Sequence, residues 1–269
     1  GNDQLMWVGC AYLFYCVAIN IVNSLEVYYF TYIMGRPKAF SIFSTINIAL
    51  GIVATSLFPI LSKKFSRKTL FTCALICLLC GLGLFAVAGD NLALVLLAAS
   101  LFGLPQQIVF LIVLMVITDS VEYGQLKLGH RDESLALSVR PLLDKFGGAV
   151  ANGVVGQVAI IAGMTTGASV STITVAQAHN FKLLMFAVPA VLVVISIFVF
   201  GKKVFLSEEK HAEIVAQLEK TWGKHLDKGE KTPNQVVVPA PISGQLIKLA
   251  DVDDETFSFG AAGDGFAIK

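Results

Sequence analysis

The feature that most constrains this chain is a series of six long apolar stretches. A helix needs about 20 mostly apolar residues to cross the hydrocarbon core of a bilayer. Because that core holds no water, each stretch must satisfy its own backbone hydrogen bonds as a helix. The sequence therefore predicts an all-α membrane protein with six transmembrane helices, over Leu5–Tyr32, Phe40–Leu61, Leu70–Ala88, Leu92–Thr118, Val139–Ala162 and Phe181–Phe200.

The composition separates this membrane part from a more polar tail. The chain is 55% hydrophobic and 14% charged, whereas soluble proteins carry about 25% charged residues. Residues 1–203 hold 21 charged side chains, and the much shorter segment 204–269 holds 18. A net charge of +1 leaves no basic surface of the size that a phosphate backbone needs. The composition argues against an ordinary globular enzyme and against a nucleic-acid partner.

The chain divides into three parts. Residues 1–203 form the six-helix membrane domain, and 204–235 are expected to be a cytoplasmic helix and linker, with Ile214 and Leu218 on one helical face. From residue 236 an alternating, turn-rich pattern predicts the start of a truncated β-rich domain. Because transporters are commonly built from related halves, and because the first residues are loop-like and the last apolar, we expect this chain to be one half with a missing partner half.

Lysine and arginine residues predict the orientation, because cytoplasmic loops carry the excess of positive charge. Eight such residues follow spans two, four and six, whereas three lie on the other side. This asymmetry predicts that the first residues and the tail are cytoplasmic in a multi-pass protein of the cell membrane. The eight are Lys63, Lys64, Arg67, Lys68, Lys127, Arg131, Lys202 and Lys203, and the three are Arg36, Lys38 and Lys182.

Ionisable residues near or within the spans are the first candidates for function, because each is costly in hydrocarbon. Asp119 and Glu122 share one helical face and either face water or hold an inner gate by pairing with a basic residue. Arg140 and Asp144 are spaced to form an i, i+4 ion pair. Lys145 has no evident partner, so it is expected to face a polar cavity or a carboxylate of another segment.

Three other groups of residues are open to two interpretations. Glu26 is expected to be an interfacial side chain beside three tyrosines rather than a functional acid. The loop with Lys127, His130 and Glu133 is either a solvated anchor or a site where His130 titrates during proton coupling. Cys73, Cys77 and Cys80 are expected to pack in the core, because no histidine or carboxylate completes a metal site.

Two sets of segments carry a resemblance to a known family. The first set lies in the membrane part, at Thr118–Gly124, Arg131–Ser134 and Ser138–Lys145, and the second lies in the tail, at Pro239–Gly244, Leu249–Asp254 and Gly263–Lys269. The membrane segments resemble the glycoside–pentoside–hexuronide:cation symporters, especially the lactose and raffinose permeases of lactic acid bacteria. The tail segments resemble the opening of a glucose-type IIA module of the sugar phosphotransferase system.

The resemblance implies a twelve-helix major-facilitator-type fold, of which this chain would supply the C-terminal half and the start of the IIA-like module. It implies transport of galactosides with a cation, a proton in the first instance, or sugar exchange, by alternating access. No other cofactor is implied. The positions of Lys127, His130 and Glu133 are linked to transport and coupling, and that of Lys145 to the sugar and cation cavity. At Arg140 and Pro141 the melibiose-type members have uncharged polar residues, so direct sugar contact is not expected there.

The resemblance also implies regulation through the IIA-like module, with the phosphocarrier protein of the phosphotransferase system as its partner. The phosphorylated histidine of that module lies beyond Lys269, so no phosphorylation site is expected within the chain, His211 and His225 included. Two alternatives remain open at this point: a membrane-embedded enzyme that uses Asp119, Glu122 and His130, and a membrane scaffold or receptor in which Lys145 pairs internally.

Overall fold

The computed structural model describes residues 2–89, 91–222, 246–248 and 266–268. It contains seven α-helices within these ranges, a π-helical turn that continues the first helix, a short 3-10 turn and two short strands. The helices are α1 (Asp3–Tyr28), α2 (Pro37–Lys64), α3 (Arg67–Val87), α4 (Leu92–Leu128), α5 (Glu133–Ile161), α6 (Val175–Lys203) and α7 (Glu208–Trp222); the turns are Tyr29–Ile33 and Val170–Thr172; the strands are β1 (Leu246–Lys248) and β2 (Phe266–Ile268).

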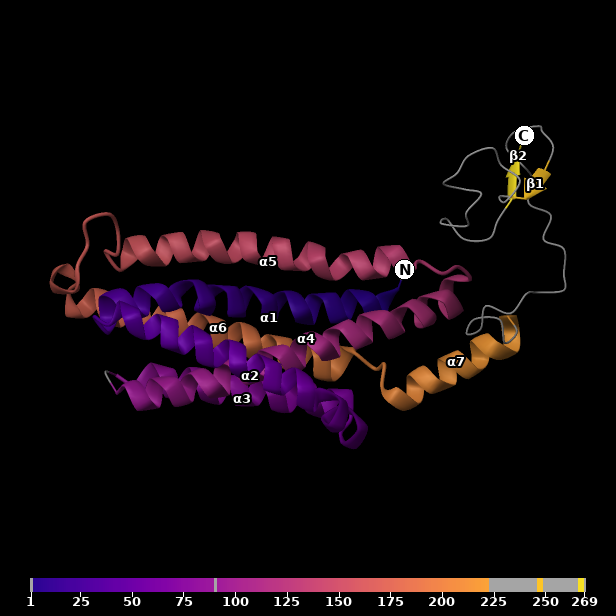
Figure 1. Cartoon of the computed structure of the whole chain (residues 1–269), viewed down its shortest axis with the longest axis horizontal. Helices are drawn as coiled ribbons and strands as arrows, with labels where there is room; N and C mark the ends of the chain where they lie inside the picture. Colours follow the sequence, from indigo (N-terminus) through magenta and orange to yellow (C-terminus); the bar gives the residue numbers. More distant parts are fainter. Residues whose placement is uncertain (1, 90, 223–245, 249–265, 269) are drawn as a thin grey trace. The chain divides into compact units, whose positions relative to one another are not determined.

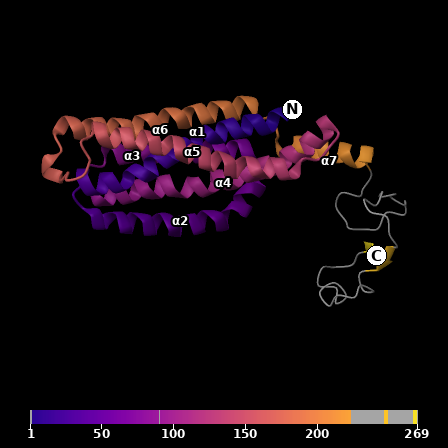
Figure 2. The ribbon, with the colours of Figure 1, turned by 90° about the horizontal axis from the view of Figure 1, so that it is seen from above.

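The six long helices lie side by side in one bundle (Figure 1). The principal packing pairs are α3 with α4, α1 with α6, α1 with α5, and α2 with α4. In Figure 1, α5 and α3 lie at opposite edges, and in Figure 2, α6 and α2 do so. The helices α1 and α4 therefore form the inside of the bundle, and every other long helix packs on one or both of them.

Five of these helices are long and apolar enough to cross a membrane: α1 with its π turn, α2, α3, α4 and α6. The predicted fifth span is also one helix, α5, of 29 residues. It does not reach the same hydropathy, because Arg140, Asp144, Lys145 and several glycines interrupt its apolar residues. All six predicted segments are long helices, and five of them qualify as membrane spans within the described residues, whereas α5 does not.

The connection between α4 and α5 is shorter than predicted. Residues Glu122–Leu128, expected in a loop, continue α4, and α5 begins at Glu133 rather than at Val139. Gly129 ends α4 with φ of +79°, the left-handed conformation that glycine adopts without steric cost. Only residues 129–132 connect the two helices, so most of the predicted loop residues are held on rigid helix ends.

Two details of core packing complete the bundle. The aromatic rings of Tyr29, Phe30, Phe43, Phe85 and Phe186 gather where α1, α2, α3 and α6 meet. The prediction that the α3 cysteines pack in the core is wrong for Cys73 and Cys80, which are exposed. Their sides of α3 face outward, where a thiol acts as a small apolar group.

The tail is confirmed as helical over its first part. Helix α7 packs on α4 and buries Ile214 and Leu218, as their shared face predicts. The chain forms two compact units, Gly1–Gly223 and Lys224–Lys269. In the second unit, β1 and β2 pair antiparallel with Leu246 opposite Ile268. The predicted linker residues 223–235 and most of the IIA-like segment lie outside the described residues.

Candidate functional site

Six helix ends meet at one end of the bundle, here called the basic end: the starts of α1, α3 and α5 and the ends of α2, α4 and α6. The Asn2 amide donates to the Ser120 carbonyl over 2.6 Å, which joins the start of α1 to α4. The Gln4 side chain accepts from the backbone N–H of Phe205, just after α6. The residues predicted to be cytoplasmic by charge therefore lie together, on one side of the bundle.

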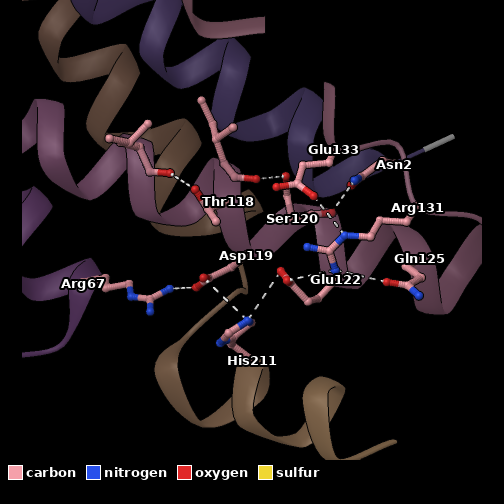
Figure 3. A network of polar contacts seen from close by, with 12 residues as sticks. Asn2, Arg67, Thr118, Asp119, Ser120, Glu122, Gln125, Arg131, Glu133 and His211 are labelled. Carbon is pink, nitrogen blue, oxygen red and sulfur yellow. Dashed lines mark hydrogen bonds and ion pairs between the residues drawn. The ribbon is translucent and has the colours of Figure 1, made fainter. Parts of the chain in front are cut away.

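A polar network occupies the basic end (Figure 3). Arg67, at the start of α3, pairs with Asp119 near the end of α4, and both side chains are about nine-tenths buried. The backbone N–H of Arg67 also donates to Glu208 of α7 over 2.8 Å. Asp119 therefore has the basic partner that the predicted inner gate requires. This partner lies on a different helix, so residue spacing within α4 could not have predicted it.

Glu122 joins the same network one turn further along α4. Its carboxylate lies 3.4 Å from the guanidinium of Arg131, which also contacts Glu133 at 3.2 Å and Gln125 at 3.3 Å. Figure 3 shows Arg131 reaching from the short α4–α5 connection over these side chains. The network thus links the starts of α3 and α5 to the end of α4.

His211 of α7 points into this network from the tail (Figure 3). Its Nε2 lies 3.6 Å from Asp119 and 3.8 Å from Glu122. Burial of the imidazole lowers the pKa of His211, an effect that Glu122 opposes and the nearby Arg67 charge strengthens. The docked helix α7 therefore favours the neutral histidine.

The three loop residues implicated by the resemblance do not meet. Lys127 pairs with Asp3 of α1, whose carboxylate also accepts from the Tyr123 hydroxyl at 2.9 Å. His130 is 60% exposed and contacts Asp132 at 2.9 Å. Glu133 lies beside Arg131, as described above. Their shared role in transport stays a prediction, and in this conformation each has a separate partner at the basic end.

The predicted ion pair of α5 is present. Arg140 and Asp144 are 3.2 Å apart, and the Arg140 guanidinium stacks 3.9 Å from the Phe110 ring of α4. The hydroxyl of Tyr12 donates to Asp144 over 2.5 Å. This pair therefore contacts both α1 and α4.

Lys145 lies on the other side of α5. Its side chain is exposed, as are those of Leu142 and Phe146 beside it. Within the described part of the chain no ion pair or hydrogen bond is formed by its ammonium. The predicted cavity or partner carboxylate is therefore not supplied by the helices described, and this face of α5 is open.

A cavity of about 690 Å³ lies between α1, α2 and α4, and its lining was not predicted from the sequence. Its polar side chains are mostly amides and hydroxyls. Two glycines let the helices approach around it, because a Cβ on Gly51 or Gly103 would meet the side chain of Gln107 or Asn47. The polar lining consists of Asn23, Glu26, Ser44, Asn47, Thr55, Ser56, Gln106 and Gln107.

Two buried acceptor atoms in this cavity have no hydrogen-bond partner among the described residues: Glu26 Oε1 and Asn47 Oδ1. The expectation that Glu26 is an interfacial side chain is wrong, because it is 5% exposed and faces the cavity. Buried polar atoms without partners are rare and point to a missing ligand or water. Both residues line the cavity, where a donor-rich molecule would lie beside them.

A second cavity, of about 160 Å³, extends the polar face along α1. It is lined by Tyr12, Asn20 and Asp144 and shares Gln106 and Gln107 with the larger one. The α1 residues that line the two cavities recur one or three residues apart and so share one face of the helix; they are Tyr12, Tyr15, Cys16, Ile19, Asn20, Asn23 and Glu26. A helix rises about 1.5 Å per residue, so this polar face is about 21 Å long.

Residues 1–201 match the family model described as MFS/sugar transport protein. The chain belongs to this family. It is 65% identical to the raffinose carrier protein of Pediococcus pentosaceus over the whole chain, and 51% identical to the lactose permease of Lactobacillus delbrueckii subsp. bulgaricus over 99% of it. The chain covers 43% of the length of each of these relatives, less than half.

The family makes this chain part of a multi-pass membrane protein, as its apolar helices predict. The resemblance to the lactose and raffinose permeases is confirmed by these relatives. Their names describe carriers and permeases, which favours the transporter interpretation over the membrane-embedded enzyme. The likeness of the tail to a IIA module stays a prediction.

Proposed function

We propose that this chain is half of a carrier that moves galactosides of the lactose and raffinose type across the cell membrane by alternating access. The observation that carries the proposal is the polar cavity between α1, α2 and α4, with two unsatisfied acceptors within apolar helices. The names of the similar proteins, raffinose carrier and lactose permease, supply the substrate class.

The chemistry of the cavity suits a sugar. Sugar hydroxyls both donate and accept hydrogen bonds, so they suit a lining that holds the carboxyl of Glu26 and the amides of Asn47, Gln106 and Gln107. The ring of Phe40 offers an apolar surface on the same lining. The volume falls within the range of about 300–1,000 Å³ typical of small-molecule sites.

We also propose the orientation of the carrier, its coupled cation and the roles of its charged residues. The basic end is cytoplasmic, a proton is the coupled cation unless sugar exchange replaces net symport, and the missing half covers the open face of α5 with Lys145. The ion pairs of Asp119 and Glu122 hold an inner gate. Lys127, His130 and Glu133 act in coupling at the same end. An internal partner for Lys145, expected of a scaffold, is missing from the described helices.

Regulation by the tail is part of the proposal. Helix α7 leads from the membrane domain to the segment that resembles a IIA module, and it contacts Asp119 and Arg67 through His211 and Glu208. Phosphorylation of the complete module by a phosphocarrier protein would act on transport through this helix.

The test is galactoside binding and uptake by the full-length carrier in membrane vesicles. Asn47→Ala removes one of the two unsatisfied acceptors, so we expect the galactoside Kd to rise about 5- to 10-fold, the value of one hydrogen bond to a sugar. Thr45→Ala, two residues away on an exposed side of α2, serves as the matched control and leaves the Kd unchanged. Equal affinities for both variants and the parent would place the sugar elsewhere.

A further inference from the structure

Glu26 differs from the other carboxylates described in the long helices. Asp119 pairs with Arg67, Glu122 with Arg131, and Asp144 with Arg140, and Asp3 pairs with Lys127. Glu26 has no cation within ion-pair distance in the described part of the chain, and its Oε1 accepts no hydrogen bond. It is nevertheless 5% exposed. A buried acid without a partner does not stabilise the bundle, but it can bind a proton or a ligand that enters the cavity.

Among the residues that the structure describes, no charged side chain other than Glu26 lines this cavity. The lining near Glu26 is uncharged. It includes Phe40, Ser44 and Asn47 of α2 and Gly103, Gln106 and Gln107 of α4. Arg36 and Lys38, at the start of α2, are exposed and do not line the cavity, and His179 and Lys182 of α6 line a different one. On its own helix the nearest titratable groups are phenols, and the Tyr29 hydroxyl donates to the Gly89 carbonyl over 3.3 Å.

We propose that Glu26 is the proton-binding residue of the sugar cavity in this half of the carrier. The inference rests on the proposed function. A carboxylate that is buried without a cation or a donor is far more costly than the neutral acid. The empty cavity therefore holds Glu26 with its proton, which makes the carboxyl both a donor and an acceptor toward a sugar hydroxyl.

The proton balance is simple. When the cavity is open to one side of the membrane, a proton from the water there adds to the Glu26 carboxylate and forms the O–H bond. When the cavity opens to the other side and the sugar leaves, water enters, hydrates the carboxylate and accepts the proton. Gln106 and Gln107 extend the polar lining from Glu26 toward Asn20 and the Asp144 pair, so water can follow the face of α1.

The test compares Glu26→Gln with the parent in the full-length carrier. Glutamine keeps the shape and hydrogen-bonding capacity of the protonated acid but cannot release a proton. We expect exchange of internal for external galactoside to continue, at a reduced rate, because the amide still contacts the sugar but replaces one of its hydrogen-bonding groups. We expect uphill accumulation driven by a pH gradient to fall at least 10-fold, to simple equilibration. Glu219→Gln, an exposed carboxyl of α7, is the matched control and keeps full accumulation.

A binding measurement in detergent makes the test independent of transport. In the parent, the galactoside Kd should rise as the pH rises through the titration of Glu26, and Glu26→Gln should bind with a Kd that is flat from pH 5.5 to 9. Uphill accumulation by Glu26→Gln, an unchanged pH dependence, or a complete loss of galactoside binding would each overturn the proposal, the last because the neutral mimic must bind. If the parent itself binds no galactoside, it is the proposed function that fails.

Discussion

At Gly81, where α3 crosses α4, the backbones of the two helices come into close contact. A Cβ at this position would lie 2.9 Å from the Leu101 carbonyl carbon and 2.9 Å from the Phe102 nitrogen. These are backbone atoms, so no side chain can rotate away, and α3 must move back by about 0.5 Å to reach an ordinary van der Waals contact. Gly83, two residues later, has nothing within 4 Å of its Cβ position.

The pair Gly81→Ala and Gly83→Ala isolates the cost of this contact. Both substitutions gain about 1 kcal/mol of helix propensity, so that term cancels between them. Overpacking of a tight contact costs about 1–3 kcal/mol, and α3–α4 is one of the principal packing pairs of the bundle. We expect Gly81→Ala to be less stable than Gly83→Ala by about 1–3 kcal/mol.

The assay is thermal unfolding of the purified full-length carrier in detergent, followed by intrinsic fluorescence. At about 2–4 °C per kcal/mol, the midpoint of Gly81→Ala should lie several degrees below that of Gly83→Ala, which should equal or exceed the parent. If the two variants unfold at the same temperature, the close approach of α3 to α4 does not limit stability, and the reasoning is refuted.

Four further outcomes are expected in the full-length carrier. Arg67→Ala leaves the buried Asp119 carboxylate without its guanidinium, so the carrier should lose about 3–5 kcal/mol of stability, seen as a lower unfolding midpoint that Asp119→Asn in the same background partly restores. Docking of α7 lowers the pKa of His211 below its ordinary value of 6.5, so the undocked helix binds the proton more readily. The docked state should therefore be favoured above pH 6.5 and should weaken as the pH falls below that value. Amide hydrogen exchange of α7 between pH 7.5 and 5.5 measures this change, and His211→Gln should remove the pH dependence. Lys145→Ala should abolish galactoside accumulation in vesicles, and normal accumulation would remove Lys145 from the transport pathway. Gly103→Ala places a Cβ 2.8 Å from the Asn47 Cγ, so it should displace that amide and weaken galactoside binding as much as Asn47→Ala does.

Features set by local sequence were predictable. The long apolar runs identify the helices, because hydrocarbon leaves the backbone no other way to pair. Arg140 and Asp144 pair because four residues bring them to one helical face. Helix α7 follows from the spacing of Ile214 and Leu218. The eight lysines and arginines that the charge asymmetry assigned to one side of the membrane lie at one end of the bundle, the basic end.

The partners of Asp119 were not predictable, because they come from helices distant in the chain. Asp119 meets Arg67 from 52 positions earlier and His211 from the tail. Glu26 was expected to be an interfacial side chain from its tyrosine neighbours, yet it is buried beside a cavity lined by α2 and α4. Apolar helices of this kind can pack on one another in many rotations without changing their hydropathy.

The amino-acid sequence alone thus predicts a membrane bundle of long helices and the charged residues at its basic end. It also identifies the family. Which side chains share a cavity depends on how α1, α2 and α4 are rotated against each other. Close contacts between α2 and α4, such as those of Gly51 with Gln107 and of Gly103 with Asn47, help to fix that rotation. Their effect appears only when the opposing helix is in place. The burial of Glu26 without a cation among the described residues therefore results from helix packing. The sequence around each of its neighbours gives no local sign of it.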